Sequence, residues 1–306
     1  MNLRCLIVGM GVQGTKRRRV AGTDCVGTVD PVAADATWRD VAEVPDDAYD
    51  AALLCVPEAP KSDLALRLVA RGKHVLVEKP FWAADVASLD RIETEARRTR
   101  AVVYTAYNHR FEPGFVALRE ALASGRLGRI YHCRLFYGNG TARLVRDFAW
   151  RDTGAGVLPD LGSHLLDTLR FWFGDIADDF RVVVASRHEN RAPDRVQLAG
   201  GGAPTFDLDM SLLSWRNHFT CDLFAEHGSA HLESLCKWGE SRLTLRSRVL
   251  PAGRPVEEIR SWPEGDPTWA AEYAYFRDLC MRRVPADLSG DRWLLSTLGR
   301  LAAQVA

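Results

Sequence analysis

The sequence lacks any run of about 18 apolar residues, which is the length that a membrane-spanning helix needs. Its opening segment, MNLRCLIVG, enters an apolar stretch too short for the core of a signal peptide. Its seven cysteines are scattered, and no two stand as close together as zinc ligands do. These absences predict a cytoplasmic protein with reduced, mostly buried thiols, no membrane association and no metal site.

An excess of either charge is also missing, because 40 basic residues balance 40 acidic ones. A chain without a net field is not drawn to nucleic acid or to an anionic membrane, so neither is expected as a partner. Lysine is scarce, with five residues against 35 arginines. The longest basic run, Lys16–Arg19, is interpreted as a solvated helix face in preference to an anion site, and its role stays open.

What the sequence does contain is the composition of an ordinary globular protein, with 47% apolar and 26% charged residues. In the first hundred residues, short apolar runs alternate with amphipathic stretches, which is typical of βαβ units and a doubly wound parallel sheet. The expected strands are 3–8, 25–30, 51–56, 74–79 and 101–106, and the clearest helices are 60–71 and 84–99.

The pattern changes after residue 106. From about 180 to 260 the apolar residues alternate in period two without intervening helices, which predicts an antiparallel sheet. We therefore expect a first domain of residues 1–106 and a second, α/β domain of residues 107–306 with an open, mainly antiparallel sheet. The other expected elements are helices near 113–124, 160–173, 267–283 and 290–304, a strand near 130–138, and an irregular stretch up to 157.

A glycine motif follows the first expected strand and opens the first helix: Gly9-Met10-Gly11-Val12-Gln13-Gly14. In this context, Gly9 allows a tight turn, Gly11 lets a pyrophosphate approach the backbone, and Gly14 lets helix and strand pack closely. Val12 and Gln13 then offer N–H groups at the helix N-terminus. Taken alone, the glycines are as consistent with a structural turn; in register with the strands, they predict a Rossmann-type dinucleotide-binding domain.

Asp30 ends the second expected strand, about twenty residues after the glycines. An acidic residue there accepts hydrogen bonds from the adenosine ribose and repels a 2′-phosphate, which favours NAD(H) over NADP(H). A turn initiated by Asp30 before Pro31 is the alternative.

Two further motifs carry chemistry. Glu78-Lys79-Pro80 closes the fourth strand at the sheet edge where ligands bind, so Lys79 is expected to face the cofactor cleft, although a strand-end lysine is usually just solvated. Asp160 and His164 are four residues apart at the start of a helix, so both lie on one face. The carboxylate can orient the imidazole for proton transfer; an aspartate N-cap beside a satisfied histidine is the alternative.

Four motifs together, GMGVQG, HVLVEKP, YNHRF (107–111) and GAGVLPDLGSHLLD (154–167), resemble the Gfo/Idh/MocA oxidoreductases over nearly the whole chain. The resemblance implies that Lys79 binds and polarises the reacting oxygen, that His164 is the general acid/base, that Asp160 supports it, and that Asn108 lines the same pocket. It also implies cofactor contacts from Glu78 and Pro80. The chain departs from the family in its short length and in GAGVL, which replaces a double glycine.

The expected activity is reversible hydride transfer between NAD(H) and a carbinol or ketone carbon of a sugar, amino sugar or nucleotide-linked sugar. Lys79 and His164 are expected to meet near the nicotinamide, without a metal. Imine or non-sugar ketone reduction, and a non-catalytic dinucleotide-binding regulator, stay open as alternatives. Further substrate contacts are expected from Trp150 and Arg151 in the irregular stretch, where solvated arginines are the alternative.

A homodimer or homotetramer is also expected, formed through the C-terminal sheet. The resemblance implies such an interface, and an open sheet must cover a second apolar face. Phe206, Leu208 and Met210 supply one face, and Leu212, Trp215 and Phe219 continue apolar surface nearby.

Overall fold

The computed structural model describes residues 3–82, 85–148 and 151–305, and its chain divides into two compact units. The first comprises Met1–Asn108 and Trp269–Leu295, and the second comprises His109–Thr268 and Ser296–Ala306. We keep the domain boundary expected near residue 106 as a proposal. The return of residues 269–295 to the first unit had no signal in the sequence, because it depends on contacts between distant segments.

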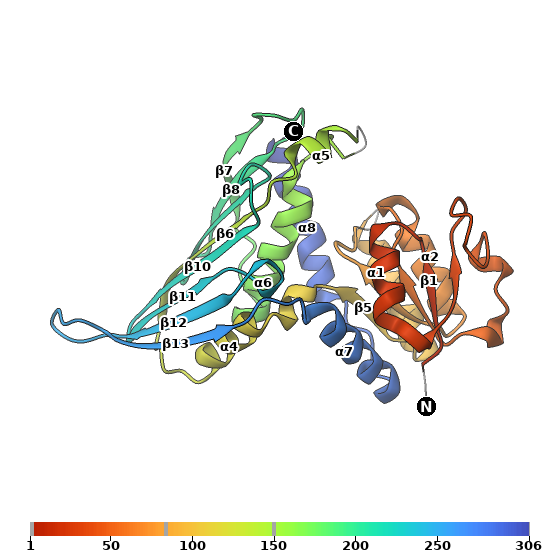
Figure 1. Ribbon diagram of the computed structural model, residues 1–306, viewed down its shortest axis with the longest axis horizontal. Helices are drawn as coiled ribbons and strands as arrows, with labels where there is room; N and C mark the ends of the chain where they lie inside the picture. Colours follow the sequence, from red (N-terminus) through yellow and green to blue (C-terminus); the bar gives the residue numbers. More distant parts are fainter. Residues whose placement is uncertain (1–2, 83–84, 149–150, 306) are drawn as a thin grey trace. The chain divides into compact units, whose positions relative to one another are not determined.

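The first unit is built on a five-stranded parallel sheet in the order β2-β1-β3-β4-β5 (Figure 1). Because β1 and β3 are neighbours while β2 lies outside β1, the strand order reverses next to β1, which is where open α/β sheets bind their ligands. The strands are β1 (Cys5–Val8), β2 (Cys25–Val29), β3 (Ala51–Leu54), β4 (His74–Glu78) and β5 (Val103–Ala106). All five lie within the ranges expected from the sequence.

The helices of this unit are α1 (Val12–Ala21), α2 (Glu58–Ala70), α3 (Val86–Thr99) and α7 (Thr268–Arg282), with the first part of α8 (Ser289–Val305). α2 and α3 agree with the amphipathic stretches in the sequence. The Asp85 side chain caps α3 by accepting a hydrogen bond from the N–H of Ser88 at 2.7 Å, and Arg100 ends the helix in the left-handed conformation.

α7 is tied to the parallel sheet by buried polar contacts. The hydroxyl of Tyr273 donates a hydrogen bond to the carboxylate of Asp24 at 2.9 Å and lies 3.2 Å from the thiol of Cys5. Further along the chain, Arg292 of α8 pairs with Asp90 and Glu93 of α3. These contacts account for the membership of residues 269–295 in the first unit.

The second unit is built on an eight-stranded sheet in the order β13-β12-β11-β10-β6-β9-β8-β7, in which only β6 and β9 run parallel. The mainly antiparallel sheet expected from the sequence is confirmed. The strands are β6 (Ile130–Gly138), β7 (Arg181–Ser186), β8 (Arg195–Gly200), β9 (Thr205–Ser211), β10 (His218–Ala225), β11 (Gly228–Glu233), β12 (Ser241–Ser247) and β13 (Val256–Trp262).

One face of this sheet is covered by α4 (Pro113–Ala123) and α6 (Ser163–Phe173), as Figure 1 shows. Phe115 of α4 packs on Phe219 of β10 with ring centroids 4.9 Å apart, and the indole N–H of Trp172 donates to the Phe115 carbonyl at 3.0 Å. Phe206, Leu208 and Met210 point into this covered core and are at most 2% exposed.

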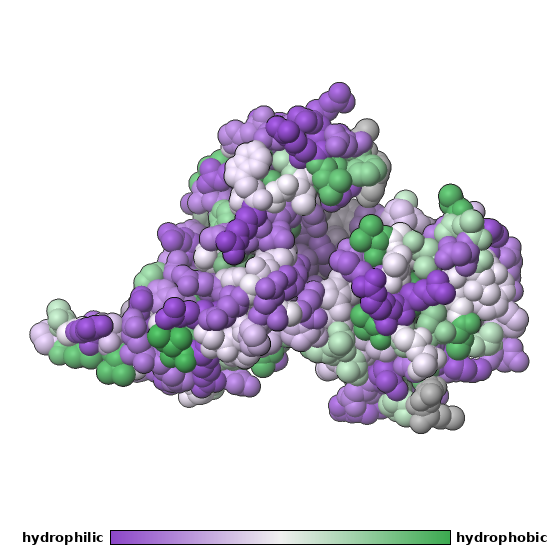
Figure 2. Space-filling view, viewed as in Figure 1, coloured by the Kyte–Doolittle hydropathy of each residue, from purple (hydrophilic) through white to green (hydrophobic). Residues whose placement is uncertain are grey.

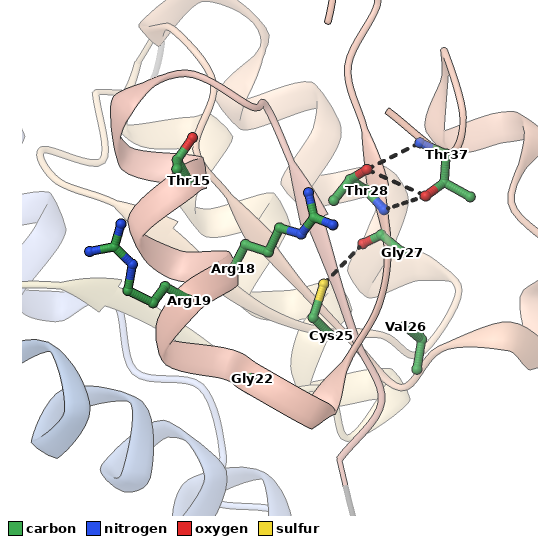
Figure 3. Close-up of a pocket in the computed structure, with 9 residues that line it drawn as sticks. All are labelled: Thr15, Arg18, Arg19, Gly22, Cys25, Val26, Gly27, Thr28 and Thr37. Atoms are coloured by element: carbon green, nitrogen blue, oxygen red, sulfur yellow. Dashed lines mark hydrogen bonds between the residues drawn. The ribbon is translucent and has the colours of Figure 1, made fainter. Parts of the chain in front are cut away.

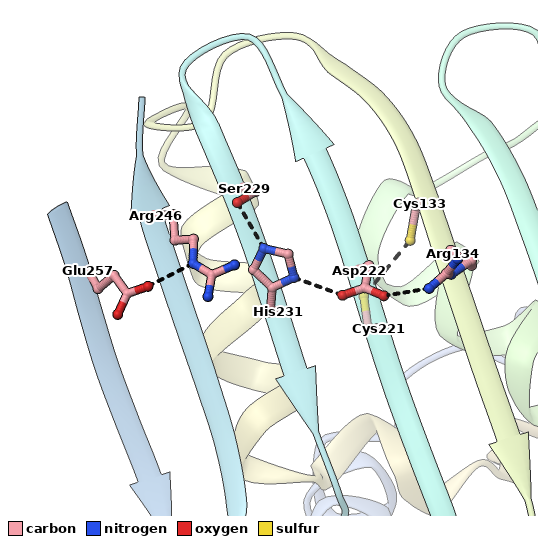
Figure 4. A network of polar contacts seen from close by, with 8 residues as sticks. All are labelled: Cys133, Arg134, Cys221, Asp222, Ser229, His231, Arg246 and Glu257. Carbon is pink, nitrogen blue, oxygen red and sulfur yellow. Dashed lines mark hydrogen bonds and ion pairs between the residues drawn. The ribbon is translucent and has the colours of Figure 1, made fainter. Parts of the chain in front are cut away.

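The opposite face carries a row of polar side chains. Figure 4 shows Arg134, Asp222 and His231 linked across β6, β10 and β11, with Arg246 and Glu257 paired beside them. The apolar residues singled out in the sequence therefore do not form an uncovered second apolar face, apart from Trp215, which is 77% exposed. They are buried against the unit's own helices.

On the described surface, exposed apolar side chains are scattered: Figure 2 shows small hydrophobic patches in a mainly hydrophilic view. Leu250 and Val256 are each 69% exposed near the loop that joins β12 and β13. Within the described part of the chain, no helix combines the length and apolarity required to cross a bilayer.

Candidate functional site

The glycine motif forms the turn between β1 and α1. Gly9 has a φ of +91°, and its N–H donates to the carbonyl of Val29 at 2.8 Å. A Cβ at Gly14 would lie 1.8 Å from the Gly9 carbonyl oxygen, so helix and turn approach more closely than any other residue permits. Gly9 and Gly14 thus have the packing roles expected from the sequence.

Gly11 occupies a different environment, because a Cβ there would meet nothing within 4 Å. It is the N-cap residue of α1, no side chain caps the helix, and its first turn holds no acidic residue. Val12 is 75% exposed and Gln13 is also exposed. The open space and the uncapped N–H groups fit the diphosphate of a dinucleotide.

The carboxylate of Asp30 links this turn to the loop after β2. Its Oδ2 accepts a hydrogen bond from the N–H of Met10 at 2.7 Å, and its Oδ1 accepts from Val32 and Ala33 at 2.8 Å each. These backbone donors, led by Met10, lower the pKa of Asp30. The carboxylate thus serves as a structural anchor of the turn, whereas its expected contact with the adenosine ribose stays a prediction.

Arg39 lies close to Asp30. Its Nη1 donates to the carbonyls of Asp30 and Ala33, and its charge contributes to the lowered pKa of the Asp30 carboxyl. A cation therefore stands next to the carboxylate that was expected to exclude a 2′-phosphate.

The basic run of α1 does not act as one surface. Arg18 and Arg19 border a cavity of about 590 Å³ between the end of α1 and β2, where Thr28 and Thr37 bond to each other (Figure 3). Arg17 instead turns inward and is 1% exposed. The interpretation of the run as a solvated helix face is wrong for Arg17, because two buried carboxylates draw it into the core.

Arg17 holds the side chain of Glu78, the last residue of β4. Its Nε is 2.6 Å from a Glu78 carboxylate oxygen, and its Nη2 is 2.7 Å from a carboxylate oxygen of Glu272 on α7. The guanidinium also lies over the ring of Trp269, 4.4 Å from its centroid. Glu78 is thus anchored by an ion pair before the chain reaches Lys79, which is half-buried and joined to Pro80 by a cis peptide bond.

A second buried cation holds the backbone on both sides of Lys79. The ammonium of Lys61, in the first turn of α2, donates to the carbonyls of Glu78 and Pro80 at 2.9 and 3.0 Å, and to the carboxylate of Glu58 at 3.0 Å. Burial lowers the pKa of Lys61, while Glu58 partly offsets this effect. The turn that carries Lys79 is therefore fixed from α1 and from α2.

In the second unit, Asp160 and His164 lie on two successive helical segments. Residues Leu158–Gly162 (η5) form a π-helical turn that continues directly into α6, and the hydroxyl of Ser163 donates to the Asp160 carbonyl at 3.0 Å. The sequence indicated one regular helix from about 160. Single π-helical turns are frequent at functional sites, and this one widens the turn between the carboxylate and the imidazole.

His164 is 7% exposed and stacks on His109 of η4 (Asn108–Phe111), with ring centroids 4.0 Å apart and planes inclined by 19°. Tyr137 approaches both imidazoles edge-on, at 5.3 Å from His109 and 5.9 Å from His164. Trp238 also packs on Tyr137, with ring centroids 5.7 Å apart and planes inclined by 31°. Burial, followed by the charge of Asp160, raises the pKa of the Tyr137 phenol, which therefore stays neutral.

A partly buried ion pair joins the two segments that carry the histidines. Arg110 of η4 binds both carboxylate oxygens of Asp167 on α6, one of them at 3.0 Å. Burial raises the pKa of Asp167 more strongly than Arg110 lowers it. The motif around residues 107–111 thus supports the helix of His164 through a stack and an ion pair.

Three further residues, Asn108, Trp150 and Arg151, were expected to contact the substrate. Asn108 is 8% exposed and begins η4, and Arg151 is half-buried, with its N–H donating to the Phe148 carbonyl at 2.8 Å. Trp150 lies outside the described residues. The substrate roles expected for these three residues stay predictions.

The chain after residue 151 is anchored to the loop before β8. Asp152 accepts hydrogen bonds from the N–H groups of Arg191 and Ala192 at 3.1 and 2.8 Å. Gly156 has a φ of +56°, and a Cβ there would lie 2.1 Å from the carbonyl oxygen of Pro193. The GAGVL segment therefore requires its second glycine for backbone reasons.

Several residues that support Lys79 in the first unit and His164 in the second were not singled out from the sequence. Arg17 and Lys61 could not be recognised because their partners are distant and their burial depends on the tertiary fold. His109 and Arg110 lie in the YNHRF motif, but only the structure shows their contacts with His164 and Asp167. Within the described ranges, no group of three or more His, Cys, Asp or Glu side chains is arranged to hold a metal ion.

The fold and these residues define a two-unit protein with a dinucleotide-binding Rossmann sheet. The sequence profile described as "Oxidoreductase family, NAD-binding Rossmann fold" matches residues 3–107, and the "GFO/IDH/MocA C-terminal domain" matches residues 115–231. The chain belongs to the Gfo/Idh/MocA family of oxidoreductases, which confirms the resemblance seen in its motifs.

Relatives support the same assignment. Inositol 2-dehydrogenase 4 of Saccharopolyspora erythraea is 30% identical over 86% of this chain and 85% of its own length. Trans-1,2-dihydrobenzene-1,2-diol dehydrogenase of Bos taurus is 28% identical over 70% of this chain, and the chain spans 62% of that enzyme. Levoglucosan dehydrogenase in complex with NADH has the same fold, with a TM-score of 0.82, 16% identity, and coverage of 100% of this chain and 98% of its own.

Proposed function

We propose that the protein transfers a hydride reversibly between NAD(H) and a carbinol or ketone carbon of a small cyclic polyol, with a sugar, amino sugar or nucleotide-linked sugar as the preferred class. The observation that carries the proposal is the position of Lys79 directly after β4. Arg17 and Lys61 bind the residues on either side of it and thereby fix the turn that it occupies. Burying two cations around a single turn has a desolvation cost, and solubility does not require such an arrangement.

The chain's residues divide the chemistry between them. The ammonium of Lys79 donates a hydrogen bond to the reacting oxygen and stabilises negative charge on it. The imidazole of His164 takes the hydroxyl proton in oxidation and returns it in reduction, while Asp160, four residues earlier, supports it. Bound NAD(H) supplies the hydride acceptor or donor at the nicotinamide.

The substrate class rests on two kinds of support. Relatives include proteins named for inositol, a dihydrobenzene diol and levoglucosan, which share vicinal hydroxyls on a ring. In this chain, Tyr137 packs edge-on against His164, and the half-buried Trp238 packs on Tyr137; aromatic faces pack well on the apolar face of such rings. Cyclic diols that are not sugars are therefore a second substrate class.

NAD(H) is proposed as the preferred cofactor because of the charge of Asp30, with Arg39 as the residue that limits this preference. Association of copies through the eight-stranded sheet is also proposed.

The reaction is tested with purified protein, NAD+ and a panel of myo-inositol, levoglucosan, UDP-N-acetylglucosamine and trans-dihydrobenzene diol, read at the nicotinamide absorbance. Lys79→Met and His164→Gln are each expected to lower turnover by about 10²–10⁴-fold, the usual worth of a positioned acid/base group, with NADH affinity nearly unchanged. Near-normal turnover of both variants would reject the mechanism, even though the family assignment would stand.

A further inference from the structure

Lys61 is a fully enclosed lysine whose three N–H donors are all in use. It is 2% exposed, and two of its three partners are the main-chain carbonyls of Glu78 and Pro80, the residues on either side of Lys79. Its third partner, Glu58, is one helical turn earlier and supplies the compensating charge at 3.0 Å. One ammonium therefore joins the start of α2 to both ends of the Lys79 peptide unit.

Stability alone does not account for a lysine here. Enclosing an ammonium costs free energy, and an apolar side chain of similar length would fill the same space at a lower desolvation cost. What an apolar residue cannot do is donate hydrogen bonds to two carbonyls at the end of β4, that of its last residue, Glu78, and that of Pro80. A compact ammonium with three donors suits this point better than a planar guanidinium.

The same turn is fixed a second time through a side chain. Arg17 binds the Glu78 carboxylate, so Glu78 is held at both its side chain and its carbonyl, and Pro80 is held at its carbonyl. Lys79 lies between two anchored residues, which restricts where its side chain begins. Positioned groups lose catalytic power when their supporting contacts are loosened, even if the groups themselves are intact.

We propose that Lys61 is a positioning residue for the reaction, which acts by holding the Glu78 and Pro80 carbonyls and thereby the direction of Lys79. The proposal rests on the proposed catalytic role of Lys79. It assigns to Lys61 a function in turnover, distinct from cofactor binding, and it predicts that the effect of Lys61 passes through Lys79.

The first test reads the environment of Lys79 directly and needs no substrate. The chain has only five lysines, so reductive methylation with ¹³C-formaldehyde gives a small set of NMR signals that single-lysine variants assign. In Lys61→Met, the Lys79 signal is expected to shift or broaden. Lys73→Met is the matched control, because Lys73 also donates to a carbonyl, that of Tyr49 at 2.9 Å, but lies just before the opposite end of β4. An unchanged Lys79 signal in Lys61→Met overturns the proposal.

The second test is a double-mutant cycle on turnover of whichever panel substrate is oxidised. Lys61→Met is expected to lower kcat about 10–100-fold with NADH affinity unchanged, whereas Lys73→Met leaves kcat near that of the wild type. The double variant Lys61→Met/Lys79→Met is expected to be no slower than Lys79→Met, since both act through one group. Multiplied losses in the double variant mean a purely structural role and overturn the proposal.

Two outcomes separate this proposal from the one it rests on. If the single variant Lys79→Met keeps normal turnover, the proposed function fails. If Lys79→Met lowers turnover but Lys61→Met does not, only the positioning role of Lys61 is rejected. Should Lys61→Met not fold, Lys61→Arg carries the same measurements, because it keeps the charge but cannot place one nitrogen on both carbonyls.

Discussion

At the scale of single residues, Asp30 has a structural role and a proposed role in cofactor selectivity, and substitution can separate the two. Its carboxylate accepts three backbone N–H groups, so Asp30→Ala loosens the glycine turn for either cofactor. Asp30→Asn removes the charge and keeps one of the two oxygens that accept these N–H groups, so it disturbs the turn less than Asp30→Ala does. We expect Asp30→Asn to raise the ratio of NADPH to NADH affinity about tenfold, because a partly solvated charge acts over a few ångströms with about that strength.

Nicotinamide fluorescence titrations of the wild type and the variant measure this ratio. Arg39→Ala is the companion variant, since it removes the cation beside Asp30 and is expected to move the ratio in the opposite direction. Tighter binding of NADPH than NADH by the wild-type protein contradicts the proposed preference.

A second residue-scale prediction concerns the buried pair of Arg110 and Asp167. The pKa of Asp167 is raised by burial, so its contribution to stability is fully present below its unfolded pKa and is lost as pH rises through its folded pKa. Removing Arg110 leaves the carboxylate enclosed without its ion-pair partner. Arg110→Met is therefore expected to cost about 3–5 kcal/mol of unfolding free energy at pH 8 and clearly less at pH 5.

Asp167→Asn should behave differently, because the side chain of Arg110 is 33% exposed and can turn to water. Its cost is expected to be smaller and almost independent of pH. Urea unfolding of both variants at the two pH values tests the asymmetry, and equal losses from the two substitutions would falsify it.

The candidate residues that the sequence made visible are those with local signals. Lys79 ends an apolar strand, the glycines follow one, and His164 opens an amphipathic helix, so spacing alone placed them at element ends. Arg17 and Lys61 gave no such signal. From sequence alone, an arginine or lysine in a helix is interpreted as solvent-exposed. Only the tertiary structure shows that carboxylates and carbonyls of distant segments surround it.

At the scale of elements, the junction of β1 and α1 yields a contrast between two glycines of one motif. A Cβ at Gly14 would overlap the Gly9 carbonyl, whereas a Cβ at Gly11 would enter open space at a φ of −67° that alanine adopts readily. Gly14→Ala is thus expected to disrupt the first unit. Gly11→Ala should fold normally and yet fill the cradle for the phosphates.

We expect Gly11→Ala to keep its melting temperature within a few degrees and to weaken NADH binding about tenfold or more. Gly299→Ala, in the middle of α8 where a Cβ also meets nothing, is the control and should gain about 0.5–1 kcal/mol without any change in NADH affinity. Unchanged NADH affinity in Gly11→Ala would place the phosphates elsewhere.

Most elements could be predicted because period-two and helical patterns are local. β8 (Arg195–Gly200) and β13 (Val256–Trp262) were not singled out. β8 is short and buries only two alternating residues, Val196 and Leu198, and β13 is a mostly exposed edge strand without a buried face. The π-helical turn at Leu158–Gly162 could not be foreseen, because one extra residue in a helix leaves almost no trace in the apolar spacing.

At the scale of the whole molecule, the two faces of the eight-stranded sheet differ in whether they can bind a second copy of the chain. α4 and α6 cover one face of the eight-stranded sheet, so an oligomer cannot depend on the apolar residues named from the sequence, with the exception of the exposed Trp215. The open face has another character: Arg134, Asp222 and His231 form a connected polar row, and Phe224 and Ile259 on the same face are each 46% exposed.

A face of this kind can still bind a second copy, because interfaces between protein copies combine aromatic anchors with satisfied polar groups. We predict a dimer or tetramer at micromolar concentration, with Phe224→Asp shifting it towards the single-chain mass. Since Phe224 lies away from the covered core, this variant should keep its fold.

The same substitution at Met281, which is 56% exposed on α7, is the control and should leave the mass unchanged. Light scattering with increasing salt should also show weaker association, because charged rows contribute to the contact. A wild-type protein that scatters as a single chain under these conditions contradicts the prediction.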